Sequence, residues 1–146
     1  MTIATVPLKL IVQGLEASSE PFRQYLDIEE MKIVSLPQNH PQDDSSPEEL
    51  EMSEQIKQLY KKRYFPLPDP SEIDDYRIMR NFVYSLNEGD VKDELESALH
   101  GKGAFRRFKS AVHYTGMNNT WYSFRDTVYR EIAVKWCQQN NLNIDL

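Results

Sequence analysis

Apolar residues recur along this chain at the three- to four-residue spacing of amphipathic helices, in stretches separated by polar or proline-rich segments. The first stretch has Pro7 in its expected first turn, where a missing N–H costs the helix nothing. It predicts a short helix whose buried stripe consists of Leu8, Ile11, Val12 and Leu15.

Residues 25–28 and 31–36 have the composition of strands, because they are rich in Ile, Val and Tyr. Glu29 and Glu30 separate them, and we interpret the two segments as a small β-hairpin. A hairpin alone is marginally stable in water, so its apolar face is expected to pack on helices.

Residues 38–46 are polar and lack periodicity, which predicts a flexible linker. The linker ends at a helix start, with Ser46 as N-cap, Pro47 at the first helical position and Glu49 completing a capping box. This helix is expected to extend to about residue 63 and to bury Leu50, Met52, Ile56, Leu59 and Tyr60.

Alternate prolines exclude a helix in residues 65–70, so this segment is expected to be a stiff connector. The next helix is predicted to be capped near Ser71 and to end at residues 87–90, with a buried stripe of Met79, Phe82, Val83 and Leu86. A last helix is expected over residues 120–139, followed by a frayed tail. Its buried face consists of Trp121, Phe124, Val128, Ile132 and Trp136.

Two glycines, Gly101 and Gly103, interrupt a stretch that otherwise keeps one helical phase. A single continuous helix explains that phase but loses about 1 kcal/mol at each glycine. In the favoured alternative, two helices meet at a corner, where Gly101 ends one helix in a left-handed conformation and Gly103 caps another that begins near Ala104. The expected buried stripe is Val91, Leu95, Ala98, Phe105, Phe108 and Val112.

Together these patterns predict a single, predominantly helical α+β domain of five or six helices with a small N-terminal β-hairpin. Its parts are a helix-plus-hairpin region over residues 1–37, the linker at 38–46 and a helical core over 47–146. A length of 146 residues and an apolar content of 40% suit one core. Since no apolar run is long enough for a membrane span and residues 1–15 lack a secretion signal, a cytoplasmic protein is expected.

The charge is unevenly distributed, since residues 1–100 carry 10 Lys and Arg against 20 Asp and Glu, whereas residues 101–146 carry 7 against 3. The net charge of −6 disfavours non-specific nucleic-acid binding by the whole protein. Cys137 is the single cysteine, which excludes an internal disulfide and a cysteine-rich zinc site. The histidines show no metal-ligand spacing, so neither a metal nor another cofactor is expected; they are His40, His100 and His113.

The cations of the C-terminal part concentrate around the glycine corner. Guanidinium and ammonium groups beside the free N–H groups of a helix N-terminus form an anion site. The residues predicted to form it are His100, Gly101, Lys102, Gly103, Arg106, Arg107 and Lys109. In a structural alternative, the same cations pair with acidic side chains such as Asp74, Asp75 or those of residues 93–96.

Two further groups are secondary candidates. Asp74 and Asp75, followed by Arg77, have the residue types for acid–base work, but adjacent helical side chains point about 100° apart, which favours helix capping or ion pairing. Tyr122 and Arg125 have the residue types that stack on a nucleic-acid base, whereas helical spacing places their aromatic neighbours in the core.

The run A-L-H-G-K-G-A-F-R-R-F-K, which extends from Ala98 to Lys109, resembles the signature of a small, mostly bacterial family described only as an uncharacterised protein family. Three further segments fit the resemblance, namely residues 25–27, 74–79 and 121–126. It covers nearly the whole chain and implies no activity. The family tends to have a Thr-Gly pair where this chain has Glu30 and Met31.

We therefore predict a non-enzymatic binding or adaptor module whose basic corner takes a phosphate, a nucleotide, an RNA segment or an acidic patch on a protein. One alternative is a small enzyme that acts on an anionic substrate with His100 and Asp74 or Asp75. Another is a purely structural motif, with the function on a surface that the sequence does not mark. An enzyme requires an enclosed pocket where His100 and a carboxylate converge, whereas a binding module requires only an exposed corner. The oligomeric state stays open.

Overall fold

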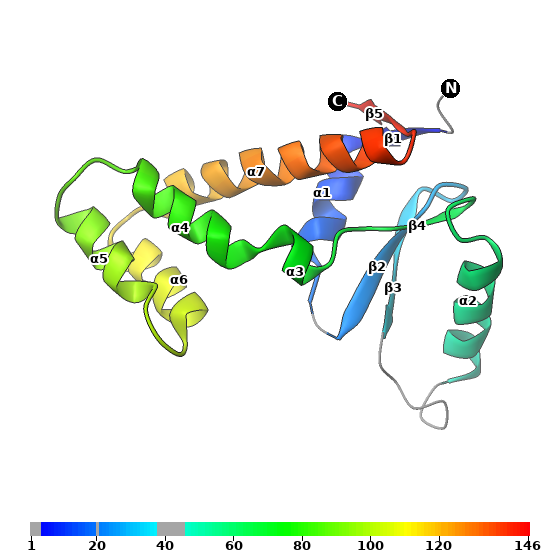
Figure 1. The fold of residues 1–146 in the computed structure, drawn as a ribbon, viewed down its shortest axis with the longest axis horizontal. Helices are drawn as coiled ribbons and strands as arrows, with labels where there is room; N and C mark the ends of the chain where they lie inside the picture. Colours follow the sequence, from blue (N-terminus) through cyan, green and yellow to red (C-terminus); the bar gives the residue numbers. More distant parts are fainter. Residues whose placement is uncertain (1–3, 20, 38–45) are drawn as a thin grey trace. The chain divides into compact units, whose positions relative to one another are not determined.

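The computed structural model describes residues 4–19, 21–37 and 46–146, and the predicted linker at residues 38–45 lies outside them. The described helices and strands form a predominantly helical α+β fold, as the sequence predicted (Figure 1). The chain divides into two compact units. Residues 1–73 with 129–146 are called the strand unit, and residues 74–128 are called the helical unit.

The strand unit contains a three-stranded antiparallel sheet with the strand order β3-β2-β4 (Figure 1). β2 (Phe22–Asp27) and β3 (Lys32–Pro37) form the predicted hairpin. In the turn between them, Met31 has a φ of 53°, a left-handed conformation that suits glycine better than a side chain. The turn therefore forms around a methionine.

The third strand, β4 (Tyr64–Pro66), overlaps the start of the segment at residues 65–70 that was expected to be a stiff connector. It pairs with β2, and the Leu67 N–H extends the pairing with a 2.9 Å hydrogen bond to the Gln24 carbonyl. Pro66 is compatible with this strand because β4 lies at the edge of the sheet, where one side of the strand needs no donor.

A second, two-stranded sheet joins the two ends of the described chain. β1 (Thr5–Pro7) and β5 (Asn143–Asp145) run parallel, with Val6 opposite Ile144. Val6 is fully buried and Leu142, just before β5, is 4% exposed. The expectation of a frayed tail is therefore wrong, because burial of these side chains and the ladder hold residues 142–145 in place.

The first two helices of the chain begin close to where the sequence predicted. α1 (Leu8–Glu16) buries the whole predicted stripe and starts directly after Pro7, which is its N-cap rather than a residue of its first turn. α2 (Pro47–Gln58) starts at the predicted cap, since the Ser46 hydroxyl accepts a 3.1 Å hydrogen bond from the Glu49 N–H.

The end and the buried face of α2 differ from the prediction. The helix ends at Gln58 rather than near residue 63, because Lys61 takes a left-handed conformation with a φ of 59°. Ile56 is its buried residue, whereas Leu50 and Tyr60, expected on the buried side, are exposed.

A buried ion pair ties the end of β2 to the chain before β4. The Asp27 carboxylate is 1% exposed and accepts hydrogen bonds of 2.9 and 3.0 Å from the Arg63 guanidinium. Burial acts to raise the pKa of Asp27, but Arg63 and the backbone N–H groups of Glu30 and Glu29 outweigh it and hold that pKa below its usual value. The pair therefore braces the sheet with a charge that stays ionised.

The helical unit starts at an N-cap that the sequence placed three residues too early. Asp69, not Ser71, caps the short α3 (Pro70–Ile73) that ends the first segment of the strand unit, by accepting the Glu72 N–H at 2.9 Å. Asp74 then caps α4 (Asp75–Ser85) and accepts the Arg77 N–H at 3.2 Å.

Aromatic rings form the core of the helical unit. The Phe82 ring of α4 lies edge-on to Phe108, with centroids 6.4 Å apart, and 5.3 Å from both Trp121 and Phe124. These rings come from α4, from α6 (Ala104–Tyr114) and from α7 (Asn118–Gln139), so the core fixes the three helices against one another.

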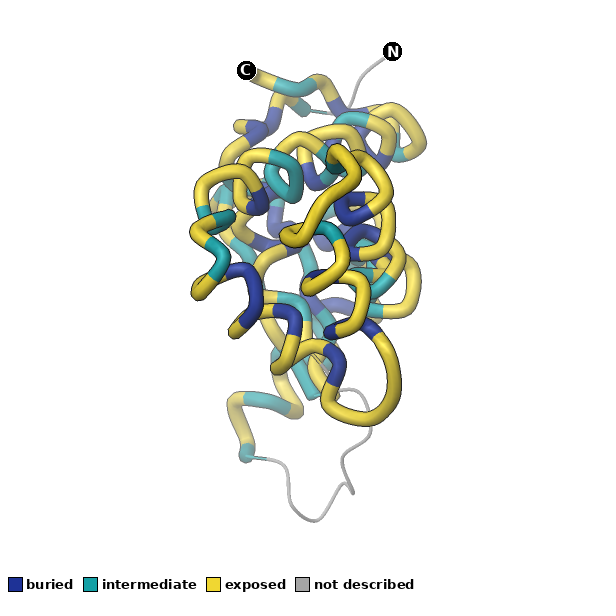
Figure 2. Tube along the Cα trace, turned by 90° about the vertical axis from the view of Figure 1, so that its left-hand side faces the viewer, coloured by how far each residue is buried: buried dark blue, intermediate teal, exposed yellow. Residues whose placement is uncertain are grey.

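The predicted stripe fails at Val91 and Phe105. Val91, in α5 (Asp90–Ala98), and Phe105, in the first turn of α6, are 38% and 50% exposed, while Leu95 and Phe108 are fully buried. Both are the second residue of their helix, so the predicted stripe is exposed where each helix begins. Figure 2 shows the resulting alternation of buried and exposed positions along the helices.

α7 contributes to both units. Trp121 lies in the helical unit and is 7% exposed, whereas Trp136 lies in the strand unit, where its ring N–H donates a 2.9 Å hydrogen bond to the Pro66 carbonyl. No helix in the described ranges, α7 included, combines the length and the apolar character needed to cross a membrane.

Candidate functional site

The glycine corner contains two helices rather than one. α5 ends at Ala98 and α6 begins at Ala104, with Gly103 as its N-cap. Gly101 and Gly103 have φ values of 79° and 77°, a conformation that residues with a side chain adopt only at a cost. The favoured interpretation of the sequence is thereby confirmed, and the continuous helix is excluded.

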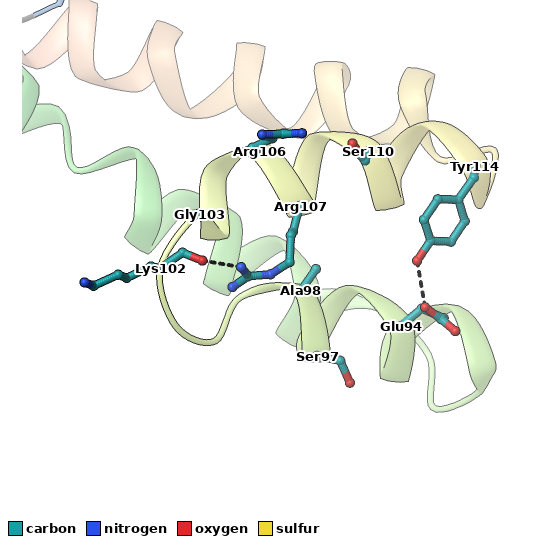
Figure 3. A pocket seen from close by; sticks show the side chains of 9 residues that line it. All are labelled: Glu94, Ser97, Ala98, Lys102, Gly103, Arg106, Arg107, Ser110 and Tyr114. Atoms are coloured by element: carbon teal, nitrogen blue, oxygen red, sulfur yellow. Dashed lines mark hydrogen bonds between the residues drawn. The ribbon is translucent and has the colours of Figure 1, made fainter.

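Arg107 bonds to the backbone of the corner. Its guanidinium donates one hydrogen bond to the His100 carbonyl and another to the Lys102 carbonyl (Figure 3 draws the second). Backbone carbonyls after a helix lack intrahelical partners, and a forked guanidinium satisfies two of them at once. Arg107, predicted as a ligand-binding residue, thus makes contacts that build the corner itself.

An open hollow of about 650 Å³ lies between α5 and α6. Its smaller lining residues are Ser97 and Ala98 of α5 and Ser110 of α6. Figure 3 shows the remaining lining residues at the two ends. The corner end is lined by Lys102, Gly103, Arg106 and Arg107, and the opposite end by Glu94 and Tyr114.

The end of the hollow away from the corner is acidic. The Tyr114 hydroxyl donates a 2.7 Å hydrogen bond to the Glu94 carboxylate, and this bond is the main reason why the pKa of Tyr114 is raised. A second hollow of about 540 Å³ shares Glu94 and Ser97 with the first and is also lined by Asp90 and Asp93. Along one face of the helix pair, the charge therefore changes from positive at the corner to negative at the start of α5.

The first turn of α6 combines free backbone N–H groups with two arginines. The turn contains no acidic residue, and its N-cap, Gly103, has no side chain to accept the free N–H groups. Arg106 and Arg107 both lie in this turn, although cations are disfavoured at the positive end of the helix dipole. Arg107 is compensated by the two carbonyls that it binds, whereas Arg106 has no such compensation among the described residues.

Within the part of the chain that the structure describes, none of the cations of the corner forms an ion pair, and Arg107 bonds to backbone carbonyls instead. Within residues 4–19, 21–37 and 46–146, neither an ion pair nor a hydrogen bond is found for the side chains of Lys102, Arg106 or Lys109. All three are exposed. Pairing of these three cations with the acidic residues of the described chain, the structural alternative, therefore has no contact to support it.

The residues of the enzyme hypothesis do not meet at this hollow. His100 is exposed in the corner loop and contributes its carbonyl to Arg107, and it does not line the hollow. Asp74 and Asp75 lie at the start of α4, where Asp74 serves as N-cap to Arg77. No cluster of three or more His, Cys, Asp and Glu side chains suited to a metal ion is found in the described part of the chain.

Tyr122 and Arg125 lie together on α7, away from the corner hollow. The guanidinium of Arg125 is 5.3 Å from the centre of the Tyr122 ring, so the two side chains stack on each other. Tyr122 is 54% exposed. The pair is thus a separate surface feature that does not add to the hollow.

The sequence marked the basic end of the hollow but not its other walls. Glu94, Ser97, Ser110 and Tyr114 line it, and none was a candidate residue. A signal existed for part of this set, because Arg106, Ser110 and Tyr114 follow one another at i, i+4 and i+8 on one face of α6. The wall from α5 depends on how the two helices pack, which local spacing does not reveal.

A comparison with known protein families matches residues 4–145 to the "Uncharacterised protein family (UPF0158)". Comparisons with curated proteins and with solved structures gave no match.

Proposed function

The chain belongs to that uncharacterised protein family, whose description names no activity, and from this premise we propose that it is a non-enzymatic binding module. Its α5–α6 corner binds the phosphate or carboxylate groups of an anionic ligand or partner. The binding groups are the Arg106 guanidinium, the Lys102 ammonium and the backbone N–H groups of the first turn of α6.

One observation carries this proposal. Arg106 is exposed at the positive end of α6, beside uncapped N–H groups, and no acidic side chain of the described residues neutralises it. A cation at this position is repelled by the positive end of the helix dipole. A bound anion would interact favourably with both the cation and the helix end. An arrangement that costs stability without a ligand is typical of a binding site.

The corner supplies the groups that recognise an anion in a fixed arrangement. Arg107 and the two glycines set the path of residues 98–104, so the first-turn N–H groups are held in place before the ligand arrives. Arg106 adds a planar fork that matches two oxygens of a phosphate or carboxylate. The hollow is open, which suits the terminal or side group of a larger molecule rather than an enclosed substrate.

The test is a titration of the full chain with inorganic phosphate against chloride at matched ionic strength, followed by the backbone amide NMR signals and by thermal melting. We expect the amides of Ala104, Phe105 and Arg106 to shift and the melting midpoint to rise, since a ligand that binds the native state stabilises it. Nucleotides, a short RNA and polyglutamate then distinguish the classes of anionic partner.

Two variants make the test specific. Arg106→Ala should abolish the amide shifts and the rise in midpoint, while Arg80→Ala, which removes an equally exposed arginine of α4 outside the hollow, should preserve both. Equal phosphate responses of Arg106→Ala and the unchanged chain would disprove the proposal. Amide signals that shift evenly over the whole surface would disprove it too.

A further inference from the structure

The face of the α5–α6 pair carries opposite charges at its two ends, and from this we propose that it docks with the same face of a second copy of this chain. This inference rests on the proposed function, because it identifies the anionic partner of the corner as the acidic end of α5 in that second copy. The basic end consists of Lys102 and Arg106, and the acidic end consists of Asp90, Asp93 and Glu94.

The charges on this face are segregated, although the helical unit is balanced as a whole. Residues 74–128 contain eight Lys and Arg and eight Asp and Glu. Four acidic residues and a lysine lie in α5, while α6 contains three cations and no acid. That lysine, Lys92, is paired with Glu88, 2.9 Å away, and so does not neutralise the acidic end.

A two-fold axis that lies in the plane of this face, across its middle, brings opposite charges together twice. The chain reverses at the corner, so α5 and α6 lie side by side and the corner is at the far end from Asp90 (Figures 1 and 3). Turning a second copy by half a turn therefore places its acidic end on the first copy's basic end, and its basic end on the first copy's acidic end. Such self-complementarity is what a symmetric dimer interface requires.

The partner's carboxylates would meet more than Arg106 in this arrangement. They would also lie near the uncapped N–H groups at the start of α6, where negative charge is favoured by the helix dipole. The middle of the face has small side chains, those of Ser97, Ala98 and Ser110, and the Tyr114 ring at one end is 64% exposed, so the two copies can approach closely and bury apolar surface.

The same charge pattern argues against a nucleic acid as the occupant of this face. A phosphate backbone that continued from the corner along the hollow would meet Glu94 and then Asp93 within the length of one short helix. Like charges at close range are strongly unfavourable, whereas a partner with both signs of charge satisfies both ends.

The experiment measures the mass of the full chain by sedimentation velocity over a range of concentrations, at low and at high sodium chloride. The unchanged chain should form a dimer that weakens as salt screens the charges. Arg106→Glu and Asp93→Arg should each be monomeric alone, because each faces its own like charge across the two-fold axis. An equimolar mixture of the two variants should recover the dimer, since the introduced glutamate of one copy then faces the introduced arginine of the other.

Three results would overturn the inference. They are a monomer at every concentration, a dimer that neither variant disrupts, and two monomeric variants whose mixture stays monomeric. Folding is checked by circular dichroism, and Arg106→Glu is expected to fold, because an acid in the first turn of a helix is favourable. A monomer that binds the short RNA through Arg106 would also overturn it and name the nucleic acid as partner instead.

The experiments distinguish failure of the proposed dimer from failure of the proposed anion site. If the chain is monomeric but inorganic phosphate shifts the first-turn amides of α6 in an Arg106-dependent way, the anion site stands and the second copy is not its partner. If both hold, phosphate should compete and dissociate the dimer more strongly than chloride at the same ionic strength. If neither phosphate nor a second copy binds, both proposals fall.

Discussion

Two neighbouring arginines of α6 have different surroundings, and the difference separates the structural role of Arg107 from the binding role that we propose for Arg106. Arg107 donates to the His100 and Lys102 carbonyls, which otherwise lack partners in the tight corner. Arg106 makes no such contact within the described residues. A double substitution of both residues would mix the two roles, so each must be changed alone.

We predict that Arg107→Ala lowers the free energy of unfolding by roughly 1 kcal/mol, the usual net value of one or two such hydrogen bonds. Arg106→Ala should change it by less than about 0.5 kcal/mol, as substitutions of unpaired surface residues do. Urea unfolding of the two variants, followed by circular dichroism, compares them directly. Equal effects would contradict the division of roles, and Arg107→Lys should recover only part of the loss, because an ammonium does not fork to two carbonyls in the same geometry.

At the scale of elements, α1 packs so closely on neighbouring side chains that a glycine is required at position 14. A Cβ added to Gly14 would overlap with Cδ1 of Leu67 and lie 3.0 Å from Cδ1 of Ile33. Leu67 is fully buried, so its side chain can move only against the residues packed around it. The glycine therefore permits close packing rather than weakening the end of the helix.

Gly14→Ala should consequently destabilise the protein. In an exposed helix this change gains about 1 kcal/mol, but overfilling a packed site costs about 1 to 3 kcal/mol, and here we expect the second effect to prevail. Thermal or urea unfolding measures the sign. Gln13→Ala, at the exposed neighbouring position of α1, is the control and should be neutral or slightly stabilising. If Gly14→Ala stabilises, the close approach of α1 to Leu67 is wrong.

The elements that could be predicted from the sequence are those with local signals. The Ser46 cap, the hairpin of β2 and β3 and the two glycines of the corner each act through neighbouring residues, and each was found. The strands β1, β4 and β5 were missed, because three residues carry too little periodicity and their partners lie far away in the sequence. The role of Arg107 was missed for a related reason, since its carbonyl acceptors face it only once the corner has formed.

The candidate site was predictable to the same extent. Its cations are close to the glycines in the sequence, so local sequence alone identified Lys102 and Arg106. The acidic end depends on the packing of α5 against α6, and Asp93 and Glu94 were considered only as internal partners of these cations. The structure instead places Glu94 at the opposite end of the hollow, where it binds Tyr114.

At the scale of the whole molecule, the prediction of a single domain is still to be tested. The helical unit is an insertion between two segments of the strand unit, and each unit has its own buried core. α7 is one uninterrupted helix from Asn118 to Gln139 and so crosses from one unit into the other. If one unit unfolded separately, α7 would have to end in its middle. We therefore expect both units to unfold in one transition.

The two tryptophans allow this to be measured, because Trp121 reports on the helical unit and Trp136 on the strand unit. In urea, the fluorescence transition of Trp136→Phe should coincide with its own circular dichroism transition, and the same should hold for Trp121→Phe, as expected of one cooperative domain. Phe82→Ala, which should cost about 3 to 5 kcal/mol in the aromatic core of the helical unit, must then lower both tryptophan transitions equally. If Phe82→Ala moves the Trp121 signal and leaves the Trp136 signal in place, the two units unfold independently, and the single-domain prediction is wrong.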